Sequence, residues 1–161
     1  CVGLEPADAM RRHCTELVAR EGLEARVALR AEALEEHRPD APYHAATAIL
    51  VSQHIASDAG AVAFFTRLAA FLVPGGRLYS ADLHIGAGQD RERMLALWRD
   101  QARMSGIEAP LVEGMLERFR TEMRPRDEAA LLGFLECAGF VEILKPFSSL
   151  LYGAWSARRG T

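Results

Sequence analysis

Short apolar runs alternate with segments of helical periodicity in the first half of the chain. The apolar runs are candidate strands at residues 1–4, 26–30, 46–52 and 77–83. Between them, apolar side chains recur every three or four residues over 7–21 and again after Ser57 and Asp58, which can cap a helix. Strands that alternate with helices predict an α/β fold, with a Rossmann-like parallel sheet covered by helices on both faces.

The alternation stops after residue 83. Two helical segments follow at 89–105 and 110–123, separated by Gly106 and Pro110. Both carry an apolar stripe that must pack on something. We therefore expect residues 86–124 to form a helical insertion.

The end of the chain predicts one more helix and two strands. Asp127 can cap a helix that extends to Ala138, and Gly139 ends it. The two strands, at 140–147 and 149–157, are so close in sequence that they must form an antiparallel hairpin. A parallel sheet that closes with such a hairpin is unusual, so this feature narrows the choice of fold.

Composition limits the classes of function. The chain has 161 residues, half of them hydrophobic and a quarter charged, which suits one soluble globular domain. A net charge of −3 argues against a nucleic-acid surface. No segment is typical of a signal peptide or a membrane span, and the three cysteines lack metal-ligand spacing. We expect a cytoplasmic protein with reduced thiols, no membrane partner and no metal.

Several stretches resemble the motifs of class I S-adenosylmethionine (SAM) dependent methyltransferases. They are GLEPADAM, RVALRAEA, YHAATAILVSQHI, FLVPGGRLYSADL and LLGFLECAGFVEI, which start at residues 3, 26, 43, 71 and 131. Their order and spacing carry the resemblance more than any single stretch does. The chain departs from the family in two motifs: Gly-Asp-Ala is here Ala31-Glu32-Ala33, and an Asp is replaced by His44.

The resemblance implies a single methyltransferase domain over residues 1–161, with 86–124 as a lid. In the family, strand one lies between strands two and four and is followed by a Gly-rich loop. The chain begins too late to supply that strand, its loop and its helix, so we expect strands two and four to have unpaired edges. A longer chain, a homo-oligomer or strand exchange would then fill the gap, and residues 1–161 alone should not bind SAM.

The resemblance places the nucleoside of SAM at the first two strands. Glu5, followed by Pro6, matches the residue that accepts hydrogen bonds from the two ribose hydroxyls. Glu32 and Ala33 match the residues beside the adenine. The alternatives are an acidic residue that favours a helix start at Glu5 and a solvated loop at Glu32.

The methionine part of SAM and the catalytic groups are expected after the later strands. The resemblance places Leu50, Ser52 and Gln53 along the methionine. His54 and His84 are the candidates for a general base, since histidine titrates near neutrality. A helix-entry role for His54 and simple loop polarity for His84 are the alternatives.

The implied reaction is in-line transfer of the SAM methyl group to a small-molecule acceptor. The protein would mainly supply orientation and a dry pocket. A carboxy-SAM synthase and a non-catalytic interaction module with the same fold are alternatives. A nicotinamide dehydrogenase also uses an acidic residue after its second strand, but the closing hairpin argues against it.

Overall fold

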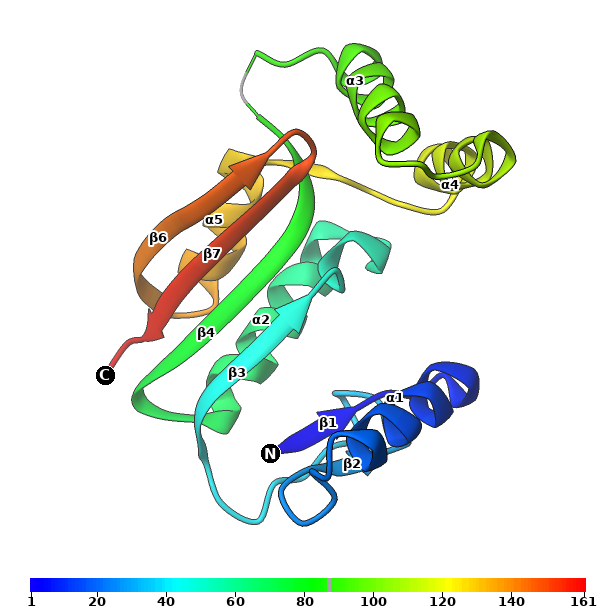
Figure 1. The fold of residues 1–161 in the computed structure, drawn as a ribbon. Coiled ribbons are helices and arrows are strands. Elements are labelled where there is room, and N and C mark those ends of the chain that lie inside the picture. Colours follow the sequence, from blue (N-terminus) through cyan, green and yellow to red (C-terminus); the bar gives the residue numbers. More distant parts are fainter. Residues whose placement is uncertain (87) are drawn as a thin grey trace. The chain divides into compact units, whose positions relative to one another are not determined.

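The computed structural model describes residues 1–86 and 88–161 (Figure 1). The chain divides into two compact units, Cys1–Ala41 and Pro42–Thr161, which are described separately. The prediction of one methyltransferase domain with a lid stays a prediction.

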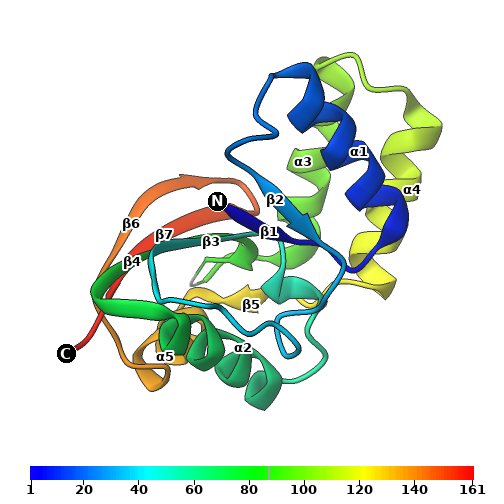
Figure 2. The ribbon, with the colours of Figure 1, turned by 90° about the horizontal axis from the view of Figure 1, so that it is seen from below.

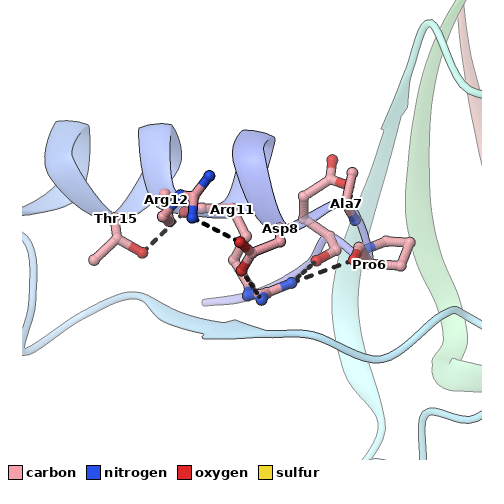
Figure 3. Close-up of polar contacts among 7 residues, drawn as sticks. Pro6, Ala7, Asp8, Arg11, Arg12 and Thr15 are labelled. Carbon is pink, nitrogen blue, oxygen red and sulfur yellow. Dashed lines mark hydrogen bonds and ion pairs between the residues drawn. The ribbon is translucent and has the colours of Figure 1, made fainter.

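The first unit is a two-stranded parallel sheet with one helix. β1 (Val2–Leu4) pairs with β2 (Ala28–Arg30), and α1 (Asp8–Arg20) connects them. Arg11 fastens the start of α1 to the chain before it, because its guanidinium donates to the backbone carbonyl of Pro6 and to Asp8 Oδ1 (Figure 3). All three elements lie within a residue or two of their expected positions.

The second unit contains a mixed sheet with the order β3-β4-β7-β6. β3 and β4 are parallel, and β7 runs antiparallel to both β4 and β6. A further short strand, β5, pairs in parallel with the end of β4. The strands are β3 (Tyr43–Ile49), β4 (Leu72–Ile85), β5 (Arg126–Asp127), β6 (Phe140–Ser149) and β7 (Tyr152–Arg159).

The helices of this unit form two groups. α2 and α5 lie together along one face of the sheet (Figure 2), and α3 and α4 extend from the end of β4. α3 and α4 share an apolar cluster with Leu83 and Leu151, which fixes them to the sheet. The helices are η1 (Ser52–His54), α2 (Asp58–Phe71), α3 (Arg91–Met104), α4 (Ala109–Thr121) and α5 (Glu128–Cys137).

The expected α/β fold with its terminal antiparallel hairpin is confirmed, with two local corrections. The strand expected at 46–52 ends at Ile49, because Leu50 has a left-handed φ of 57° and a short 3-10 helix follows. The strand expected at 77–83 begins earlier, at Leu72, so the Pro-Gly-Gly at 74–76 lies inside β4: the register passes from Tyr43–Leu72 to Ala45–Arg77, and the intervening residues bulge out of the ladder.

β1 and β3 each have an edge without a strand partner among the residues that the structure describes. β1 pairs with β2 alone, and β3 pairs with β4 alone; β2 and β6, at the other ends of the two sheets, also have one partner each. β1 and β3 are strands two and four of the resemblance, which implied an unpaired edge on each. What fills them stays a prediction.

Candidate functional site

A buried polar turn follows β3. Ser52 and Gln53 are buried, and both are bonded to the neighbouring strand β4. The backbone N–H of Ser52 donates to Asp82 Oδ1 at 3.0 Å, and the N–H of Leu83 donates to Gln53 Oε1 at 3.0 Å. These bonds hold the turn at the carboxyl end of the parallel pair, which is where α/β sheets bind ligands.

Asp82 is the central acceptor of this network. Its carboxylate is 1% exposed and also accepts from the Ser80 hydroxyl at 3.1 Å. Burial raises the pKa of Asp82, while the hydrogen bonds from Ser52 and Ser80 oppose the rise. A carboxylate this enclosed positions the turn instead of contacting a substrate.

Arg126 closes the turn from the other side. Its guanidinium donates to the carbonyls of Ser52 at 3.0 Å and Ile55 at 2.8 Å, and to Asp58 Oδ1 at 3.0 Å. It also stacks over the ring of Phe134, 5.5 Å from the centroid. The sequence analysis missed this residue, because nothing in the pattern distinguishes it from the other arginines.

His84, a candidate base, lies inside the fold. Its Nε2 is 2.8 Å from Lys145 Nζ, and that ammonium also donates to Glu128 Oε2 at 2.9 Å. Burial, and then the Lys145 charge, lower the pKa of His84, so the ring is neutral and Nε2 is the acceptor. The lone pair that a general base would use is therefore engaged.

The other candidate base, His54, is exposed at the end of η1, where its backbone N–H donates to the Val51 carbonyl at 3.1 Å. The catalytic role of either histidine stays a prediction, and the geometry is the more favourable for His54.

The nucleoside candidates lie in the first unit. Glu5 and Glu32 follow the carboxyl ends of β1 and β2, so they occupy the same edge of this parallel pair. Glu5 Oε1 accepts from the N–H of Ala7 at 2.8 Å, and Glu32 Oε1 is 2.5 Å from Nδ1 of the buried His37. The N–H of Ala33 donates to Glu36 Oε2 at 3.2 Å, which tightens the loop.

An apolar cavity of about 120 Å³ lies among α3, α4 and the sheet ends. Leu83 contributes from β4, and because side chains alternate along a strand, His84 points to the opposite face. The cavity is lined mainly by Leu83, Trp98, Met115, Phe119, Met123 and Tyr152. Four of these six residues come from the predicted insertion 86–124, and all of them except Met123 are helical, as expected.

No protein-family model and no curated protein matches the chain. Solved structures do match it. A possible exported protein from Bordetella parapertussis is 19% identical with a TM-score of 0.71, and the match covers 99% of this chain and 53% of that one. The SAM-dependent methyltransferase SibL in its apo form is 17% identical with a TM-score of 0.68, covering 99% and 43%.

Human N-acetylserotonin methyltransferase in complex with SAM also matches, at 18% identity and a TM-score of 0.56, covering 86% of this chain and 35% of that one. The chain thus has the fold of these three proteins, two of which are methyltransferases, and it spans about half of their length or less.

No helix in the described part of the chain has the length and apolar character needed to cross a membrane. Within the same residues, no group of three or more His, Cys, Asp or Glu side chains could hold a metal ion. The cytoplasmic location stays a prediction.

Proposed function

We propose that the protein transfers a methyl group from SAM to a small-molecule acceptor. The observation that carries the proposal is the fold, which the chain shares over almost its entire length with a SAM-dependent methyltransferase.

The first unit would hold the nucleoside. Glu5 uses Oε1 to accept from Ala7, so Oε2 remains to accept from ribose hydroxyls. Pro6 fixes the backbone between the strand end and α1. Glu32 and Ala33 would lie beside the adenine, on a loop that the bond to His37 keeps in shape.

The second unit would hold the methionine part at the turn after β3. The polar atoms that bond Ser52 and Gln53 to β4 and to Arg126 keep the turn rigid. Leu50, 39% exposed and in the left-handed region, is the residue of the three that presents a side chain to solvent. Ser52 and Gln53 would therefore act by positioning this segment.

The methyl-transfer step needs little chemical participation by the side chains. When bound, SAM supplies a methyl group already activated by its sulfonium charge. The chain must orient the acceptor in line and exclude water. The apolar cavity beside Trp98 and Phe119 supports this role, since helices α3 and α4 supply part of its apolar wall.

The cavity suits a small apolar part of the acceptor. Its volume is about 120 Å³ and it is partly open, so the rest of the acceptor can extend outside it. The acceptor would thus carry a small apolar group next to the nucleophile.

Isothermal titration of the full gene product with SAM tests the proposal. Saturable heat, followed by formation of S-adenosylhomocysteine when acceptors with a single ring are added, is the expected result. A folded protein that gives no saturable heat would overturn it and favour the non-catalytic interaction module.

A further inference from the structure

A second, polar groove opens between α3, α4 and β5. Its volume is about 440 Å³, and it is distinct from the apolar cavity in the charge of its walls. Four arginines line it, and Asp58 is its one acidic lining residue. The arginines are Arg91, Arg120, Arg124 and Arg126.

Two of these arginines are already paired. Arg126 is bonded to Asp58 and to backbone carbonyls, so it and the one acid of the groove neutralise each other. Arg120 donates to Glu92 at 3.0 Å, with both side chains well exposed. A surface pair of this kind contributes little and exchanges readily for a better partner.

The charges of Arg91 and Arg124 are not compensated. Arg91 Nε is buried without a hydrogen-bond partner among the described residues, and its Nη2 reaches only the Phe119 carbonyl, at 3.5 Å. The guanidinium is held over the Phe119 ring, 5.5 Å from the centroid. A buried donor without a partner is costly, which suggests that a ligand supplies one.

Arg124 is exposed, and no acid or carbonyl in the described part of the chain pairs with its side chain. Its backbone is fixed, however, because its N–H donates to the Gln53 carbonyl at 2.9 Å.

Helix stability does not account for Arg91 either. It is the first residue of α3, directly after the N-cap Asp90. The helix dipole makes this end positive, so the cation gives the helix no stabilisation; the acidic residues beside it, Asp90 and Glu92, are bonded to the Arg93 N–H and to Arg120.

We propose that this groove binds an oxyanion, the phosphate or carboxylate group of a small molecule, between Arg91 and Arg124. The planar guanidinium fork suits such oxygens, and Arg120 can turn in from the rim. Nucleic acid is a poorer fit, because the positive charge is confined to one concavity in a chain of net charge −3. The proposal is independent of methyl transfer.

Calorimetric titrations of the full chain with inorganic phosphate, and separately with citrate, test this site at constant ionic strength. Saturable binding of one of them is expected, and the tighter of the two identifies the oxyanion. Arg124→Gln should weaken it about tenfold, the scale of one charge-assisted hydrogen bond. Arg124 is exposed, so this variant should fold normally, and Arg91→Gln should act in the same direction.

Arg20→Gln, on the exposed end of α1, is the matched control and should leave binding unchanged. Equal weakening by Arg20→Gln would show a general charge effect and overturn the site. Absence of saturable binding for both anions would overturn it as well, and so would binding only to RNA or to anionic vesicles.

Discussion

Lys145 Nζ lies 2.8 Å from Nε2 of His84, and the carboxylate of Glu128 lies 2.9 Å from the same ammonium. A lysine can only donate, so His84 must accept at Nε2 and carry its proton on Nδ1, which faces the Leu151 carbonyl at 3.5 Å. The ring also meets Trp155 edge to face, with centroids 5.2 Å apart. These three side chains, His84, Lys145 and Glu128, connect β4, β6 and α5 around one neutral imidazole.

Acid should destabilise the protein through His84. Its folded-state pKa is lowered by burial and by Lys145, so the unfolded chain takes up this proton first as the pH falls. Stability should therefore decline from about pH 6.5, the ordinary value for histidine, downward toward the lowered pKa. Urea unfolding at a series of pH values measures this slope.

His84→Gln is the matched variant for this slope, because its amide oxygen can still accept from Lys145 but does not titrate. The decline near the histidine range should shrink in the variant. Asp82 has a raised pKa, so its effect on stability has the opposite sign: stability from its protonated form is lost as the pH rises. This effect is the same in the unchanged protein and in His84→Gln. An unchanged slope in the variant would contradict the role given to His84.

Gly153→Ala should destabilise the hairpin. A Cβ here would lie 2.5 Å from Trp155 Cη2 and 3.0 Å from His84 Cε1, and both rings are buried. Overpacking of this kind costs about 1–3 kcal/mol in the free energy of unfolding.

Gly133→Ala is the control for this prediction, since a Cβ on that α5 glycine meets nothing within 4 Å. It should be neutral or stabilise the protein by up to about 1 kcal/mol through helix propensity. Similar losses for the two alanines would argue against a packing effect at Gly153.

Glu5→Ala should weaken SAM binding by about 1.5–3 kcal/mol, the range for hydrogen bonds to a charged group. Calorimetric titration of the full gene product measures the change. Glu5 also accepts from the Ala7 N–H, so part of any effect could come from the start of α1. Asp8→Ala, which removes the ion pairs with Arg11 and Arg12, is the control for that part. If affinity persists in folded Glu5→Ala, the residue serves only the helix start.

Trp98→Ala should raise KM for the acceptor or lower kcat, with SAM affinity little changed. Trp98 lines the apolar cavity and packs on the cluster between α3 and α4. Leu97→Ala is the control, because this neighbouring side chain is 46% exposed. Steady-state kinetics with a methyl acceptor separate the two variants, and an equal loss of SAM and acceptor binding in Trp98→Ala would reject this division of roles.

Phe119→Ala should act like Trp98→Ala, but it is less specific, since Phe119 is 5% exposed and also supports the core.

Periodicity predicted the regular elements because each is long enough to show its pattern. α5 begins one residue after its predicted cap Asp127, and β6 and β7 form the expected hairpin. The two-residue strand β5 could not be predicted, because two residues have no period. It forms only where β4 offers a free edge for His84 and Ile85.

The contacts of the candidate site could not be predicted from the sequence. The resemblance named Ser52 and Gln53, and the structure places them in a buried turn whose bonds come from Asp82 and Arg126, distant in sequence. The same limit applies to His84. A histidine near a strand end suggests an accessible base, and only the packing of β6 and α5 shows that its acceptor atom is already taken.

Lys145 is the single lysine of the chain, so the only lysine side-chain amine is the one that contacts His84. Limited reductive methylation with isotope-labelled formaldehyde would mark only this amine and the chain terminus, and a monomethyl ammonium keeps two N–H groups, one for His84 and one for Glu128. The methyl-lysine signal in an NMR spectrum would then report the protonation state of the buried imidazole without assignment of any other residue. Because the chain has only one lysine, the contact between Lys145 and His84 can be followed by NMR through a single methyl signal.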